Sequence, residues 1–348
     1  MGTTMRRNGL DASGWVARGD SFESEGRRLD AIDALTEADR LRRDTDIERR
    51  LVRLRHEAYW DLERSSGRSS WPVITPGDDL VAPDPPQAAP EELTPELLST
   101  AILTRGCLHV RRLVPEERVG VLVDGIDRSI AGFDAHASGA SASETTPWFE
   151  PLRPRPEYSV GVKRKWVRDS GGVWTVDSPR VLSDLVDTID SVGLGAAIRA
   201  YFGERPVLSA NKCTLRRVGL DPTKANWHQD GAFLGEGIRS VNVWMALSHC
   251  GIDAPGLDIV PKRFDHVVET GTEGAIFPWA VGPGVVDRVS AASPVCRPTF
   301  EPGDVLLFDD LFLHRTAVDS AMTRERYAIE TWFFAPSAYP GGQIPIVF

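Results

Sequence analysis

The sequence has few cysteines, and they are scattered. The 348-residue chain contains four of them, Cys107, Cys213, Cys250 and Cys296, and no two form a C-x-x-C pair. Zinc knuckles and disulfide frameworks both depend on cysteines at characteristic spacings. The sequence therefore predicts neither kind of site, and buried free thiols are expected instead.

Long apolar runs and an excess of positive charge are also missing. No stretch approaches the roughly 18 apolar residues of a membrane-spanning helix, and residues 1–16 lack the apolar core of a secretory signal. The formal net charge is −10, whereas binding of nucleic acids relies on Lys and Arg contacts to phosphates. We therefore expect a cytoplasmic protein that binds neither nucleic acid nor membranes, and its oligomeric state stays open.

The N-terminal part of the sequence has the pattern of amphipathic helices. Within residues 21–64, apolar residues recur at helical spacing, first at Leu29, Ile32 and Leu35 and again at Ile47, Leu51 and Leu54. We expect one or two helices in an N-terminal helical extension of residues 1–70. A proline-rich connector with a helix follows over residues 71–105, and further helices are expected over residues 116–130 and 179–201.

From Val207 onward the sequence changes to short apolar segments separated by turn residues. These segments predict strands over residues 207–218, 225–230, 240–248, 257–260, 285–289, 304–308 and 326–334. Helices followed by many short strands favour an α+β fold with a mainly β core. We expect a double-stranded β-helix, a jelly-roll or cupin-like barrel, buttressed by N-terminal helices. The main domain would cover residues 106–348, with helical support to about residue 205 and the barrel over residues 207–335.

Two short segments of the barrel region contain candidate metal ligands. The first is Trp227-His228-Gln229-Asp230, and His314 follows 86 residues after His228. Side chains alternate along an extended segment, so His228 and Asp230 point to one face and Gln229 to the other. Two imidazoles and one carboxylate are the ligands of a facial-triad iron(II) site, which leaves open positions for a cosubstrate and oxygen. The sequence therefore predicts such a site.

An arginine at the start of the last strand is a candidate carboxylate receptor. Arg326 shares a strand face with Ala328, Glu330 and Trp332. A guanidinium directed into a barrel needs an anionic partner, because burying an unpaired charge is costly. Its planar fork suits a carboxylate. Arg324 has the same strand parity, so alternation alone leaves either arginine possible.

Residues 106–335 resemble the phytanoyl-CoA dioxygenase family of iron(II)- and 2-oxoglutarate-dependent oxygenases. The resemblance rests on an ordered set of motifs: Gly106-Cys107-Leu108-His109-Val110 with Pro115, Ala200-Tyr201-Phe202-Gly203, Trp227-His228-Gln229-Asp230, Val243-Trp244-Met245-Ala246-Leu247, Ile259-Val260-Pro261, Pro302-Gly303-Asp304, His314 and Arg326. Such an ordered set is more specific than any one motif in it.

The resemblance implies a role for each matching residue. His228, Asp230 and His314 would bind Fe(II), and Arg326 would bind the distal carboxylate of 2-oxoglutarate. Thr316 would assist Arg326, and Trp244 would line the cosubstrate pocket. The interval from His314 to the arginine is one residue longer than in the relatives, which keeps Arg324 as an alternative, but Arg326-Tyr327-Ala328 matches the family's final strand.

The implied reaction uses O2 to oxidise a C–H bond of a small organic molecule, with 2-oxoglutarate released as succinate and CO2. Related halogenases have a small residue in place of the carboxylate ligand, so Asp230 favours oxygenation over halogenation. The charge-neutral N-terminal extension suggests an enzyme of specialised bacterial metabolism. Two other functions stay open: a non-catalytic jelly-roll binding protein, and a zinc hydrolase with the same ligands, in which Arg326 has no obvious role.

The substrate contacts are less well defined by the sequence. Asn211 and Lys212, on the first barrel strand, are candidates to reach the substrate or cosubstrate. Lys163 and Trp166 belong to a basic and aromatic segment that precedes the barrel, and they could receive an anionic or ring-bearing substrate. The alternative for this segment is that its tryptophans close the core and its cations are solvated. His249 and His266 are expected to be structural or to lie at the pocket rim.

Overall fold

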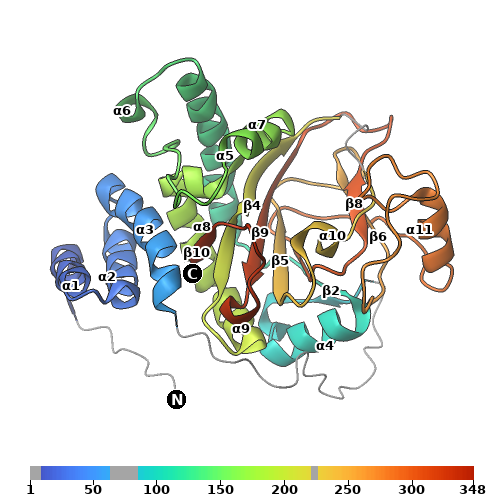
Figure 1. Ribbon diagram of the computed structural model, residues 1–348, viewed down its shortest axis with the longest axis horizontal. Helices are drawn as coiled ribbons and strands as arrows, with labels where there is room; N and C mark the ends of the chain where they lie inside the picture. The colour runs from blue at the N-terminus through green and yellow to red at the C-terminus, as the bar shows by residue number, and fades with distance from the viewer. Residues whose placement is uncertain (1–8, 63–84, 221–225) are drawn as a thin grey trace.

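Figure 1 shows the computed structural model, which describes residues 9–62, 85–220 and 226–348. The predicted boundary at residue 70 and residues 71–84 of the predicted connector lie outside these ranges. Within them, no helix combines the length and the apolar character needed to cross a membrane.

Helices precede most of the strands along the chain. The helices are α1 (Ala12–Ser24), α2 (Arg28–Leu41), α3 (Thr45–Glu57), α4 (Pro95–Arg105), α5 (Glu116–Ala137), α6 (Ala142–Thr145), α7 (Gly161–Asp169), α8 (Pro179–Ser191), α9 (Leu194–Phe202), α10 (Gly231–Leu234) and α11 (Pro283–Val289). The strands are β1 (Gln87–Ala88), β2 (Cys107–Val110), β3 (Gly172–Trp174), β4 (Val207–Val218), β5 (Ser240–Ala246), β6 (Gly256–Ile259), β7 (Val305–Phe308), β8 (His314–Ala317), β9 (Arg326–Phe334) and β10 (Pro345–Val347).

The strands form two sheets. The larger has the order β1-β2-β7-β5-β9-β4-β10, with β3 also paired to β4. In the smaller sheet β6 pairs with β8, and single bridges extend it from His228 to His314 and from Ile259 to Cys296. Figure 1 shows most of the helices on one side of the larger sheet and β6, β8, α10 and α11 on the other. The predicted α+β fold, with a jelly-roll barrel supported by N-terminal helices, is confirmed.

Both faces of the larger sheet are buried, because successive side chains along its strands point into two different cores. On β5, Val243 and Met245 belong to the core shared with the helices. Trp244 lies in the second core, inside the barrel, together with Phe308 and Trp332. Strands covered on both faces have nearly continuous apolar sequences, which is why 240–248 and 304–308 could be predicted as strands.

Residues 9–62 fold as three helices: α2 and α3 lie within residues 21–64, where one or two helices were predicted, and α1 lies mostly before that range. Asp44 caps the start of α3 by accepting hydrogen bonds from the backbone N–H groups of Asp46 and Ile47. The three helices pack against the body of the protein: Leu35 and Leu54 share an apolar cluster with Val207 of β4 and Val347 of β10.

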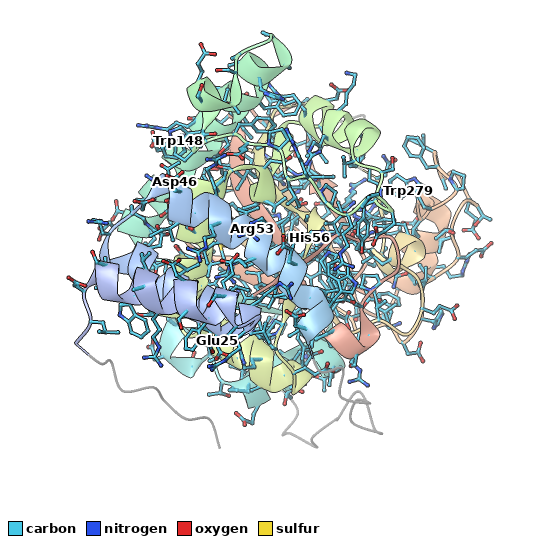
Figure 2. The ribbon with its side chains drawn as sticks, turned by 60° about the vertical axis from the view of Figure 1, so that its left-hand side comes forward. Glu25, Asp46, Arg53, His56, Trp148 and Trp279 are labelled. Carbon is cyan, nitrogen blue, oxygen red and sulfur yellow. The ribbon has the colours of Figure 1, made fainter. Side chains whose placement is uncertain are left out.

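Ion pairs also join the N-terminal helices to α8. Arg40 pairs with Asp187 and Asp190, Arg43 pairs with Asp184, and Glu48 of α3 pairs with Arg180. Figure 2 places Asp46, Arg53 and His56 along α3, and the ring of the buried His56 donates a hydrogen bond to the carbonyl of Pro345. These contacts tie the first helices to the last strand.

The structure corrects three predicted elements. Residues 285–289 form part of helix α11 and not a strand; Pro283 stands in its first turn, and Val285 and Val286 are buried against Trp227 and Leu313. Residues 226–230 make a single bridge at His228 and are not a full strand. The helix predicted over residues 179–201 is divided into α8 and α9 by Gly193, whose φ of 74° is in the left-handed region.

Candidate metal centre

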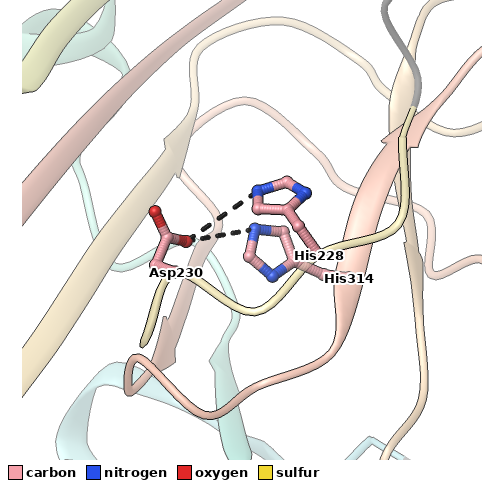
Figure 3. Close-up of side chains that lie close together, drawn as sticks. All are labelled: His228, Asp230 and His314. Carbon is pink, nitrogen blue, oxygen red and sulfur yellow. Dashed lines mark ion pairs between the residues drawn. The ribbon is translucent and has the colours of Figure 1, made fainter. Parts of the chain in front are cut away.

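The structure brings His228, Asp230 and His314 together at one end of the smaller sheet (Figure 3). Each offers one ligand atom, and these atoms lie within 4.8 Å of one another. Oδ2 of Asp230 is 3.9 Å from Nε2 of His228 and 3.8 Å from Nε2 of His314. Within the described residues this is the one group of three or more such side chains that could hold a metal ion.

Backbone pairing between distant segments sets this arrangement. His228 and His314 exchange both backbone hydrogen bonds, N–H to carbonyl, at 3.0 and 3.1 Å. Gln229 points away from the ligands and is fully buried; its amide donates to the carbonyls of Leu311 and His266, and its oxygen accepts from the N–H of Val268. Gln229 therefore fixes the turn that presents its two neighbours to the metal site.

The hydrogen bonds of the two imidazoles leave their Nε2 atoms free to bind a metal. Nδ1 of His228 lies 2.9 Å from the carbonyl oxygen of Asn226, and Nδ1 of His314 lies 2.9 Å from that of Phe312. A carbonyl oxygen only accepts, so each Nδ1 carries the proton. The unprotonated Nε2 atoms, which face Asp230, are then available as metal ligands.

The charge states of the site also suit a cation. Burial lowers the pKa of His314 to about 4, with a further contribution from His228. Burial would raise the pKa of Asp230, but Lys212 and the two imidazoles outweigh it and hold that pKa below its usual value. At neutral pH the group therefore offers a neutral His314 and a carboxylate.

These residues fit a divalent metal of the iron type. Bonds of about 2.0 to 2.2 Å to nitrogen and oxygen place neighbouring ligand atoms roughly 3 Å apart. The observed separations of 3.8 and 3.9 Å are within about 1 Å of that value. Two imidazoles and one carboxylate, with no thiolate, form the ligand set of the facial triad that binds iron(II) in oxygenases.

Arg326 lies inside the barrel and forms no close ion pair with any described residue. Its side chain is 2% exposed, and among the described residues it forms no ion pair; one Nη donates to the carbonyl of Gly256 at 3.1 Å. Its Nε is buried and has no hydrogen-bond partner in the described part of the chain, and the same holds for Nε1 of Trp244, whose ring centre is 5.5 Å from the guanidinium carbon. Burial lowers the pKa of Arg326. The Nε of Arg326 and the neighbouring Nε1 of Trp244 are therefore unused donors, and together with the buried positive charge they fit an acidic ligand such as 2-oxoglutarate.

The two candidate arginines have opposite environments. The side chain of Arg324 is 65% exposed and pairs with Asp253 at 3.4 Å, so the geometry favours Arg326 as the carboxylate receptor. Thr316 is partly exposed on β8, two residues after His314, and makes no hydrogen bond to Arg326 in the described structure. The predicted assistance from Thr316 stays a prediction.

The predicted substrate contacts have varied surroundings. Lys212 donates to Oδ1 of Asp230 at 2.9 Å. Asn211 accepts from the N–H of Ile344, while its Nδ2 is buried without a partner. Lys163 and Trp166 lie on α7, both exposed, Trp166 by 64%, and among the described residues neither has a hydrogen bond, ion pair or ring contact with the three ligands.

Two groups near the site were not singled out from the sequence. Glu330, on the same face of β9 as Arg326, accepts hydrogen bonds from Thr214 and Arg216 of the paired strand β4. Burial would raise the pKa of Glu330, but Arg216 and Arg326 lower it. Strand parity could have placed this carboxylate in the barrel, since it shares a face with Arg326.

The second group consists of aromatic rings beside His228. The ring of Phe233 is stacked at 6.2 Å, and Trp279 lies edge-on at 6.0 Å from both the His228 and the Phe233 rings. Trp279 in turn stacks on Phe277, which is 42% exposed. Figure 2 labels Trp279 at the right of the molecule, on the opposite side from Asp46 and Trp148. These rings lead from the metal ligands to the surface.

The remaining barrel histidines have other partners. His249 is 57% exposed and pairs with Glu301, and His266 is 72% exposed and pairs with Asp265. His109 is fully buried and contacts Asp304 at 3.0 Å. In the described part of the chain none of them joins the metal-ligand group.

No protein-family model matches the chain, and no curated protein matches it. Among solved structures, EctD from S. alaskensis with 2-oxoglutarate and 5-hydroxyectoine aligns with a TM-score of 0.48 and 14% identity, over 78% of this chain and 83% of that one. The 2-oxoglutarate-dependent carbocyclase SnoK from nogalamycin biosynthesis aligns with a TM-score of 0.42 and 14% identity, over 71% and 86%. AviO1 from Streptomyces viridochromogenes Tue57 aligns with a TM-score of 0.39 and 17% identity, over 69% and 94%.

Proposed function

We propose that this chain is an iron(II)- and 2-oxoglutarate-dependent oxygenase of the phytanoyl-CoA dioxygenase type. It oxidises a C–H bond of a small organic molecule with O2 and releases succinate and CO2. The observation that carries the proposal is the combination of a two-histidine, one-carboxylate group with a buried arginine that has no acidic partner among the described residues.

The relative position of the two features supports a shared ligand. Arg326 donates to the carbonyl of Gly256, which pairs with Ala317 of β8. His314 is three residues earlier on the same strand, and three strand residues span roughly 10 Å. A five-carbon dicarboxylate, with one contact at each end, covers a span of this order.

Each residue then has a defined task. His228 and His314 would hold the metal through Nε2 and Asp230 through Oδ2, and Arg326 would orient the cosubstrate by its distal carboxylate. Trp244, Phe308 and Trp332 form an apolar lining that excludes water from the interior. Bound iron(II) would supply the redox chemistry that activates O2, with 2-oxoglutarate as the electron donor.

The two alternative functions predict different chemistry. A zinc hydrolase would use the same three ligands, but it gives no role to the unused donors of Arg326 and Trp244. A binding protein without a metal gives no reason for two imidazoles to present free Nε2 atoms to one carboxylate oxygen. The oxygenase accounts for both features.

Anaerobic titration of the apoprotein with Fe(II) and then 2-oxoglutarate tests the proposal. A chelated 2-oxo acid on iron(II) gives a visible charge-transfer band, which neither alternative function produces. We expect the band in the wild type and its loss in His228→Ala, with His249→Ala as the matched control because His249 is exposed and outside the site. Absence of the band in folded wild-type protein would contradict the proposal.

A further inference from the structure

Lys212 of β4 binds one of the proposed metal ligands and leaves the other ligands untouched. Its Nζ lies 2.9 Å from Oδ1 of Asp230. The other oxygen, Oδ2, is the one that faces the Nε2 atoms of His228 and His314. The two oxygens of the Asp230 carboxylate therefore have different surroundings. Oδ1 contacts the Lys212 ammonium group, and Oδ2 faces the position that the metal would occupy.

The ammonium group of Lys212 is held by a second contact. Nζ lies 3.8 Å from the centre of the Phe233 ring, which is a cation–π distance. Phe233 belongs to α10, which begins directly after Asp230. Both contacts of Lys212 are thus made to the same short segment, and the side chains of Lys212 and Asp230 are 23% and 7% exposed.

The number of carboxylate oxygens on the metal decides how many positions stay open. Iron(II) in such sites is six-coordinate, and three protein atoms leave three positions. A 2-oxo acid chelate occupies two of them, and one is left for oxygen. If Asp230 bound through both oxygens, only two positions would remain, and the cosubstrate and oxygen would compete.

We propose that Lys212 is a positioning residue that keeps Asp230 a one-oxygen ligand by occupying Oδ1. This inference rests on the proposed function. It gives Lys212 a task within the metal site, whereas the sequence suggested a contact to the substrate or cosubstrate. Orientation of a ligand by a neighbouring hydrogen-bond partner is a general way in which proteins tune metal sites.

The test uses Fe(II) and 2-oxoglutarate as probes and three variants. Lys212→Met removes the ammonium, Lys212→Arg retains a cationic donor, and Lys262→Met is the matched control at an exposed lysine. We measure the Fe(II) affinity of each apoprotein, and then the 2-oxoglutarate affinity and the charge-transfer band of the Fe(II)-loaded form.

In Lys212→Met we expect Fe(II) affinity to be retained, because the freed oxygen can also bind the metal. Its 2-oxoglutarate affinity should fall by about tenfold or more, with a weakened band, in the range typical for loss of such partners. Lys212→Arg should recover most of the affinity, and Lys262→Met should match the wild type. If Lys212→Met does not fold, Lys212→Leu, which also lacks a donor, gives the same comparison.

Two results would overturn the inference. One is a folded Lys212→Met protein that chelates 2-oxoglutarate as the wild type does. The other is a variant that loses Fe(II) affinity but, once loaded, binds 2-oxoglutarate normally, since Lys212 would then only support the carboxylate. Failure of the proposed function itself looks different, because the wild-type protein would then show no charge-transfer band.

Discussion

Replacing Arg326 by methionine should separate binding of the cosubstrate from binding of the metal. Truncating one partner of a buried, hydrogen-bonded charge pair costs about 2 to 5 kcal/mol. Since each 1.4 kcal/mol is about a factor of ten, the Kd for 2-oxoglutarate should rise between about 30-fold and about 4000-fold. Fe(II) affinity should stay near that of the wild type, because Arg326 has no contact with the three ligands in the described structure.

The same substitution should stabilise the apoprotein. In the wild type the guanidinium is buried and forms no ion pair among the described residues. Methionine keeps much of the volume and removes the desolvated charge, at the loss of one hydrogen bond to Gly256. We expect the unfolding free energy to increase by about 1 to 2 kcal/mol, while the stabilisation that added 2-oxoglutarate and metal give the wild type is lost.

Calorimetric titration of the Fe(II)-loaded protein under anaerobic conditions measures the affinity, and urea unfolding of the apoprotein measures the stability. Arg324→Met is the matched control, since Arg324 is two residues away on the sequence and largely exposed. Unchanged 2-oxoglutarate affinity in Arg326→Met, or a loss of affinity in Arg324→Met, would refute the assignment of the carboxylate receptor.

Two further predictions concern buried groups, Glu48 between α3 and α8 and Gln229 beside the metal ligands. Burial raises the pKa of Glu48 to about 7 from 4.5, against the opposing effect of Arg180. A carboxyl group whose pKa is higher in the folded state stabilises the folded protein at low pH, and this stabilisation is lost as the pH rises through 7. The unfolding free energy of the wild type, measured relative to that of Glu48→Gln, should therefore fall by about 2 kcal/mol between pH 5 and pH 8. Urea unfolding at both pH values measures this, and a difference that does not change with pH would contradict it. Gln229→Ala should cost about 2 to 4 kcal/mol by leaving buried backbone groups of Leu311 and Val268 without partners, and should weaken Fe(II) binding; wild-type Fe(II) affinity would show that Gln229 does not position the ligands.

Much of the barrel could be predicted because its strands carry a local signal. The segments of β5, β7 and β9 contain many β-branched and aromatic residues, are bounded by turn residues and are buried over most of their length. Residues 285–289 contain three valines, which favour strands, but form a helix. A short apolar run does not distinguish a helix from a strand, and here Pro283, which favours the first turn of a helix, was the discriminating signal.

The part of the candidate site that could be predicted is the part that follows from the alternation of side chains along a strand. Alternation places His228 and Asp230 on one face and Gln229 on the other, and it groups Glu330 with Arg326. It does not give the register between strands, so the pairing of Thr214 with Glu330 and the contact of Lys212 with Asp230 could not be read from the sequence. Alternation could not separate Arg324 from Arg326 either; the family resemblance chose Arg326, and in the structure Arg324 is exposed whereas Arg326 is buried.

Crystallography of the protein grown or soaked anaerobically with Fe(II) and 2-oxoglutarate tests the central claim most directly. We expect an anomalous peak at the iron edge about 2.0 to 2.2 Å from Nε2 of His228, Nε2 of His314 and Oδ2 of Asp230. The distal carboxylate of 2-oxoglutarate should lie against Arg326, and Lys212 should stay on Oδ1. An iron peak elsewhere, or a cosubstrate bound away from Arg326, would contradict the account.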